Sequence, residues 1–98
     1  MEEKILTRNP DPAKKGVKVP KDRYDYMRGV IIELLRAGGP LANNAMIEAI
    51  VDIVERDGRV DYSVGWCAMA VKLDMEAHGE LVYDRSAKKP VISLAAGV

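Results

Sequence analysis

The side chains that most often perform chemistry in enzymes are scarce in this chain of 98 residues, which contains one histidine and one cysteine. His78 directly precedes Gly79, at the end of a helix-like segment where a cation would stabilise the last turn. Cys67 lies between Trp66 and Ala68, a setting that favours a small buried side chain over a nucleophile. No disulfide can form within the chain, and no second histidine or cysteine is present to complete a zinc site.

Two further patterns that could bind a ligand are incomplete. Gly38 and Gly39 are followed by proline instead of the Lys-Ser or Lys-Thr pair of a phosphate-binding loop. Asp57 and Asp61 lack the loop of alternating oxygen ligands that an EF-hand calcium site requires. We therefore expect no catalytic residue, no metal and no cofactor, and we expect that the protein is not an enzyme.

Basic side chains form two groups that could contact nucleic-acid phosphates. Arg85, Lys88 and Lys89 fall between two short strand-like segments, and Lys14 and Lys15 lie near the start of the chain. If about three to five such side chains contacted phosphates, the log–log dependence of affinity on salt concentration would have a slope of about −3 to −5. The alternative is that these residues keep an exposed edge soluble and block its pairing with another strand.

The segment 63–78 has more apolar residues than one buried helix face requires. Beside the stripe expected to face a core, a second stripe at helical spacing consists of Trp66, Met69, Leu73 and Ala77. Leaving this stripe in water would expose a sizeable apolar patch. We expect it to be covered by the N-terminal segment, by a second copy of the chain in a homodimer, or by a different protein partner. Trp66 is either the anchor of such an interface or an ordinary core tryptophan.

The net charge is zero at pH 7, but the charges are unevenly distributed along the chain. Residues 1–40 contain nine bases and six acids, whereas residues 41–61 contain two bases and five acids. Residues 62–82 contain one base and three acids, and residues 83–98 contain three bases and one acid. Basic ends therefore enclose an acidic middle, without the strong positive field typical of proteins that bind specific DNA sequences.

Two helices are predicted in the first half of the chain. The first begins near Pro20 and ends at residues 38–40, because proline is tolerated in a first turn and a glycine followed by proline ends a helix. The second begins after residue 41, where Asn43 or Asn44 can cap it, and ends at residues 57–58.

A third helix and a hairpin are predicted in the second half. The helix is capped by Ser63 or Asp61 and runs to about His78, with Gly79 as its stop. Residues 80–83 and 91–94 have the composition of two paired strands. Residues 1–19 read as an irregular arm with one or two strand pairings, and residues 96–98 as a frayed tail.

A helix, the turn Gly39-Pro40-Leu41, two further helices and a hairpin with a basic tip together resemble a winged helix-turn-helix domain over residues 20–95. More narrowly, residues 62–66 and 71–79 are similar to a small bacterial winged-helix-like family of unknown function. The broader resemblance implies DNA binding, with the third helix reading bases and the hairpin as the wing. That helix offers only Ser63 and Lys72 for such contacts, and Asp74 and Glu76 would approach phosphates with the wrong sign. The alternative for Lys72 is a solvated surface lysine.

The sequence therefore predicts one α+β domain, mainly α, in which a winged helix of three helices and a C-terminal β-hairpin follows an N-terminal arm. The longest apolar run has six residues, too few to span a bilayer, and the polar start does not resemble a signal peptide. We expect a cytoplasmic protein of one of two kinds. The first binds nucleic acid, or regulates transcription, through the wing and arm bases. The second is a module for self-association or another protein contact through the apolar face of the third helix.

Overall fold

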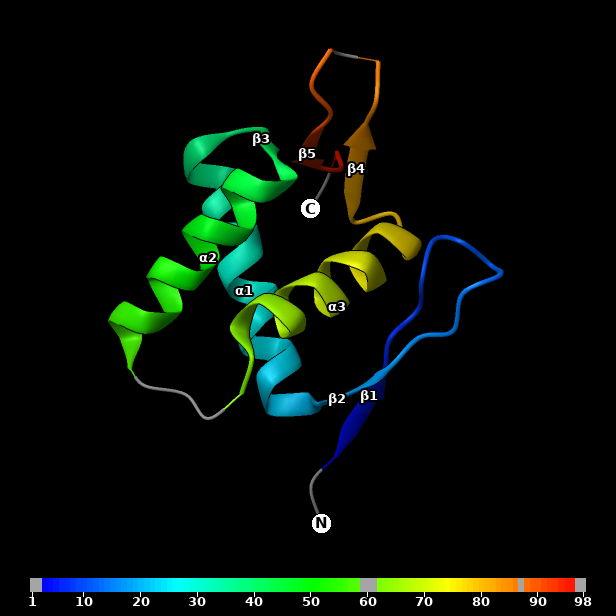
Figure 1. Cartoon of the computed structure of the whole chain (residues 1–98), viewed down its shortest axis with the longest axis vertical. Coiled ribbons are helices and arrows are strands. Elements are labelled where there is room, and N and C mark those ends of the chain that lie inside the picture. Colours follow the sequence, from blue (N-terminus) through cyan, green and yellow to red (C-terminus); the bar gives the residue numbers. More distant parts are fainter. Residues whose placement is uncertain (1–2, 59–61, 87, 97–98) are drawn as a thin grey trace.

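A computed structural model describes residues 3–58, 62–86 and 88–96 of the chain, which form an α+β fold with three helices and two small antiparallel sheets (Figure 1). The elements in chain order are β1 (Lys4–Leu6), β2 (Lys18–Pro20), α1 (Lys21–Gly38), β3 (Leu41–Ala42), α2 (Asn43–Asp57), α3 (Val64–Ala77), β4 (Leu81–Asp84) and β5 (Val91–Leu94). In the described part of the chain, no helix is long and apolar enough to cross a membrane.

Helix α1 forms where the spacing of apolar residues predicts it. Its buried side chains recur every three to four residues and pack into the core: Met27, Val30, Ile31 and Leu35. The helix ends at Gly39, whose φ of 75° lies in the left-handed region and whose N–H donates to the carbonyl of Leu35 at 2.9 Å. The predicted glycine stop is confirmed.

Helix α2 ends at Asp57 as predicted, but its predicted asparagine cap is wrong. The N-cap residue is Ala42, and no side chain caps the helix. Leu41 and Ala42 form the short strand β3, so the chain passes directly from a strand into the helix and places Asn43 in the first turn. The Oδ1 atom of Asn43 is buried without a hydrogen-bond partner.

Strands β4 and β5 form the predicted hairpin, and β3 adds an edge strand that the sequence did not reveal. The order in this sheet is β3–β5–β4, with every pair antiparallel. Leu41 pairs with Ile92, which is fully buried, so this sheet closes one end of the helical core. Helix α3 packs against both α1 and α2 and leads into β4.

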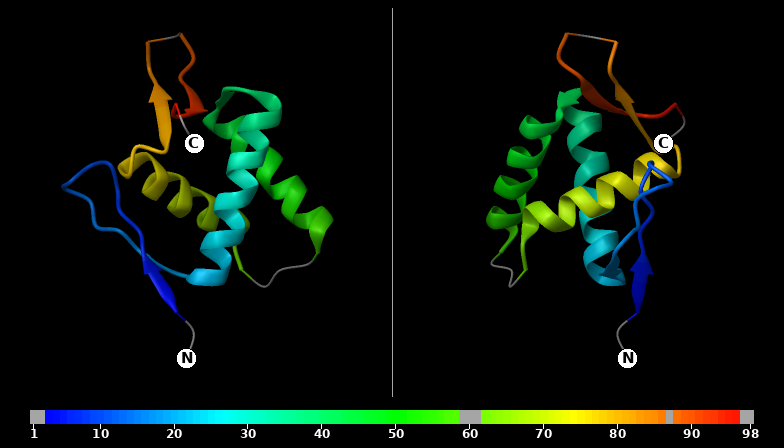
Figure 2. Two further views of the ribbon diagram at one scale, coloured as in Figure 1. Left: turned by 180° about the vertical axis from the view of Figure 1, so that it is seen from behind. Right: turned by 45° about the vertical axis from the view of Figure 1, so that its right-hand side comes forward.

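The described part of the N-terminal arm contains one strand pair and a loop. Strands β1 and β2 pair with Ile5 opposite Val19, and Val19 is fully buried in the core. Residues 7–17, which we call the arm loop, extend from this pair past α3 (Figure 2). The loop is closed by hydrogen bonds between Thr7 and Val17, including Thr7 N–H to the Val17 carbonyl at 2.8 Å. A side chain at Gly16 would overlap the Thr7 carbonyl oxygen, so this closure needs glycine.

Candidate nucleic-acid interface

The turn between β4 and β5 presents three basic residues to solvent. Arg85, Lys88 and Lys89 are all exposed, and the Arg85 guanidinium lies 5.1 Å from the centre of the Tyr83 ring. Asp84 organises the start of the turn by accepting hydrogen bonds from the N–H and the hydroxyl of Ser86, at 2.9 and 2.6 Å. These bonds hold the pKa of the Asp84 carboxyl below its ordinary value.

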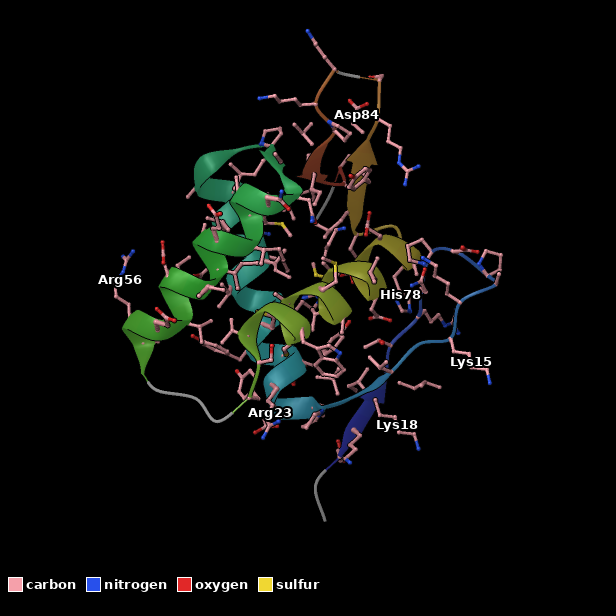
Figure 3. All side chains as sticks on the ribbon, viewed as in Figure 1. Lys15, Lys18, Arg23, Arg56, His78 and Asp84 are labelled. Atoms are coloured by element: carbon pink, nitrogen blue, oxygen red, sulfur yellow. The ribbon has the colours of Figure 1, made fainter. Side chains whose placement is uncertain are left out.

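The arm loop presents the second basic group. Lys14 closes a turn, because its N–H donates to the Asp11 carbonyl at 3.0 Å, and Lys15 follows it. Both lysines are exposed. The side chains of Lys15 and Lys18 point away from the body of the protein (Figure 3). Arg8 adds a further exposed base that the sequence analysis did not single out.

The two basic groups lie at the same end of α3. In every view of Figures 1 and 2, the arm loop and the β4–β5 hairpin flank the C-terminal end of this helix. Helix α2 lies on the side of the molecule away from the arm, and the exposed Arg56 near its end is remote from both basic groups (Figure 3). The two basic groups therefore lie on separate projections that both adjoin the C-terminal end of α3 (Figures 1 and 3).

Asp74 holds the arm against the helices. It is 2 % exposed, and its Oδ1 accepts the backbone N–H of Arg8 at 2.8 Å. Its Oδ2 accepts the hydroxyl of Tyr24 in α1, and this bond, with burial as the larger cause, raises the pKa of Tyr24 well above its ordinary value. One buried carboxylate therefore connects three segments that are far apart in the sequence.

The predictions for the charged residues of α3 are wrong. Lys72, expected either to read bases or to lie in solvent, is 5 % exposed. Its Nζ lies 3.3 Å from Glu76 Oε2 and 5.0 Å from the centre of the Tyr83 ring. Asp74 and Glu76 are largely buried as well, so neither carboxylate faces an approaching phosphate. Burial against the hairpin and the arm thus removes both the base-reading candidate and the expected repulsion.

The two polar residues at the ends of α3 have structural roles. Ser63 is the N-cap, as predicted, and its Oγ accepts the N–H of Trp66 at 3.3 Å. Asp61, the alternative cap, lies outside the described residues. His78 is the C-cap, with its Nδ1 2.8 Å from the Asp74 carbonyl, which agrees with the capping role expected for it.

The second apolar stripe of α3 is covered in part by the chain's own arm. A hollow of about 170 Å³ separates the arm loop from the helix, with Trp66, Met69 and Leu73 on one side. Its arm side is formed by Thr7, Arg8, Asn9, Lys15, Gly16 and Val17. Trp66 remains 52 % exposed, and Ala77 is exposed beyond the hollow. The arm is therefore the cover for Met69 and Leu73, whereas Trp66 is neither a core residue nor fully covered.

The sole cysteine and the acidic residues of the described part of the chain do not form a metal centre. Cys67 is buried, and burial raises the pKa of its thiol, which disfavours a reactive thiolate. Within the same described ranges, no three residues of histidine, cysteine, aspartate or glutamate are placed to hold a metal ion.

Arg28 pairs with Glu80 and joins α1 to the segment before β4.

Comparison with known proteins places the chain in a family without assigning it a function. Residues 4–91 match the family of unknown function DUF6958, and the chain belongs to that family. No curated protein and no solved structure matches it. The match covers the arm, all three helices and β4, so the arm is part of the family's shared sequence.

Proposed function

Since the family carries no assigned activity, we propose from this chain's own residues that it is a winged-helix protein that binds nucleic acid through phosphate contacts. The arm loop and the β4–β5 hairpin, which serves as the wing, supply the contacts. Helix α3 does not read bases, because its one lysine is buried. The proposal involves no catalytic step and no cofactor.

The observation that carries this proposal is that two segments beside the C-terminal end of α3 each present exposed bases. Arg85, Lys88 and Lys89 on the wing and Lys14 and Lys15 on the arm are all exposed. Binding through such contacts is independent of sequence and depends strongly on salt.

The winged-helix assignment is supported by the order and pairing of the elements. Three helices are followed by a hairpin, and the hairpin extends beyond the helices as a separate projection (Figure 1). Strand β3, between α1 and α2, joins the hairpin to the helical core through its pairing with β5. Such a framework fixes the base of the wing while leaving its tip free to contact a ligand.

The proposal is tested by fluorescence anisotropy with labelled random-sequence duplex DNA at several salt concentrations. We expect binding at micromolar protein in low salt, with a log–log slope of about −3 to −5. Arg85→Gln should reduce the magnitude of the slope by about 1, and the triple change Arg85→Gln, Lys88→Gln and Lys89→Gln by about 3.

Arg56→Gln is the matched control, because it makes the same chemical change at an exposed arginine on the other side of the molecule. It should leave the affinity and the slope unchanged. No binding in low salt, or equal effects of Arg85→Gln and Arg56→Gln, would show that the proposal is wrong.

The exposure of Trp66 favours a second candidate function, a self-association or other protein-interaction module. Light scattering over a range of concentrations tests it, and a mass above that of the monomer that is lost in Trp66→Ala would support it. A monomer at all concentrations leaves self-association unsupported. Self-association was suggested by the apolar stripe of α3, and the arm already covers Met69 and Leu73 in that stripe.

A further inference from the structure

Trp66 is the most exposed aromatic residue among those described, at 52 %. It borders the hollow between α3 and the arm loop, beside Met69 and Leu73. The indole of Trp66 therefore leaves a large, flat apolar surface in water, and contact of such a surface with water is unfavourable. A ligand with a flat apolar part would remove this surface from water.

The charges around the hollow indicate that the ligand is also an anion. Arg8 and Lys15 contribute to its arm side, and none of the residues that line it is acidic. The buried carboxylate of Asp74 accepts the N–H of Arg8, one of the lining residues, and the Tyr24 hydroxyl. A flat apolar group attached to an anion fits this combination, and a nucleotide has both parts.

A second hollow on the molecule provides a contrast. It lies between α1 and α2 and also has an exposed aromatic residue, Tyr26, at 37 %. Three of its lining residues are acidic, namely Asp25, Glu33 and Asp57, and the Tyr26 hydroxyl donates to Asp57 Oδ2 at 2.5 Å. This surface would repel a phosphate, so an aromatic side chain alone does not define the site.

We infer that the hollow between the arm loop and α3 accepts an unpaired nucleobase stacked on Trp66, with Arg8 and Lys15 near the adjoining phosphates. This inference rests on the proposed function and adds a preference for single-stranded over duplex nucleic acid. A base inside a duplex is already stacked between its neighbours and cannot place its face on the indole. Bases of an open strand can, and stacking on an aromatic side chain tolerates any base sequence.

The test uses a short oligothymidylate, an abasic strand of the same length and a duplex. Trp66 is the only tryptophan, so quenching of its fluorescence reports directly on stacking. We expect quenching by the oligothymidylate, but not by the abasic strand, which binds only through its phosphates. Trp66→Leu, which keeps an apolar side chain without a ring, should weaken oligothymidylate binding by about 5- to 150-fold. Trp66→Phe should retain part of the affinity.

Tyr26→Leu is the matched control, because it removes an exposed aromatic ring from the acidic hollow, and it should leave binding unchanged. Equal affinity for the oligothymidylate and the abasic strand, with no effect of Trp66→Leu, would overturn the inference while leaving phosphate binding intact. Absence of binding to all three ligands would overturn the proposed function as well. A tryptophan-dependent dimer that binds no nucleic acid would assign this surface to a second copy of the chain.

Discussion

Replacing Asp74 with asparagine should both weaken the fold and loosen the arm. The carboxylate accepts the Arg8 N–H at 2.8 Å and the Tyr24 hydroxyl, and it is 2 % exposed. An amide has one oxygen, which can accept the Arg8 N–H, and its NH₂ group can donate to the Tyr24 oxygen, so the Tyr24 hydroxyl proton loses its acceptor. Replacing hydrogen bonds to a charged group by neutral ones, with this proton left unpaired, costs about 1.5–3 kcal/mol. Relief from burying a charge offsets part of this cost, which leaves a net loss of about 1–2 kcal/mol.

Urea unfolding at 25 °C measures this loss, and amide exchange of Arg8 reports on the arm separately. At about 4–8 °C per kcal/mol for a domain of this size, Tm should fall by about 4–16 °C. Asp52→Asn is the matched control, because the same change falls on an exposed residue of α2 and should stay within about 0.5 kcal/mol of the wild type. The reasoning is refuted if the two variants are equally stable and exchange of the Arg8 amide is unaltered.

Two further predictions concern the arm and the pH dependence of stability. In Gly16→Ala, the added Cβ would lie 1.5 Å from the Thr7 carbonyl oxygen, so the arm loop should open at a cost of about 1–3 kcal/mol. Faster amide exchange at Thr7 with unchanged exchange in α3 would show this, and an unaltered Thr7 rate would contradict it. The hydrogen bond to Asp57 raises the pKa of Tyr26 to about 12. The raised pKa means that Tyr26 stabilises the fold below pH about 10 and loses this contribution as pH rises through 12. Absorbance titration should therefore show a phenol ionising near pH 12 that is absent in Tyr26→Phe, and identical titrations would contradict the assignment.

The helices could be predicted from the sequence because their signals are local. Buried side chains such as Ile31 and Leu35 recur at helical spacing, and Gly39 and Gly79 take the positive φ values that end α1 and α3. The β4–β5 hairpin is likewise a pairing of neighbouring segments. Strand β3 escaped prediction because its two residues become a strand only by pairing with Val91 and Ile92, about fifty residues further along the chain.

The candidate site could be predicted only in its exposed half. The wing and arm bases lie where turn residues placed them, because turns are exposed whatever the rest of the fold does. The burial of Lys72 and Asp74 depends on Tyr83, Arg8 and Tyr24, which lie in other segments of the chain and become neighbours only in the fold. One signal was available, since Asp74 stands between Leu73 and Met75 on a helix that is apolar on most of its surface.

The acids of residues 62–82 are mostly buried or paired, so the net charge of zero does not describe the charge on each part of the surface. Residues 62–82 count as acidic in the sequence, yet Asp74 is buried, Glu76 is paired with Lys72, and Glu80 is paired with Arg28. Two of these three acids are therefore balanced by a neighbouring cation, whereas Asp74 keeps its charge in hydrogen bonds to neutral donors. The exposed acids of α2 lie away from the arm (Figure 2). Under the proposed function, a phosphate backbone would approach the arm and the wing and not the acidic face of α2. Such an orientation of nucleic acid on the protein requires only that basic and acidic residues lie on different parts of the surface. A net charge of zero is compatible with it.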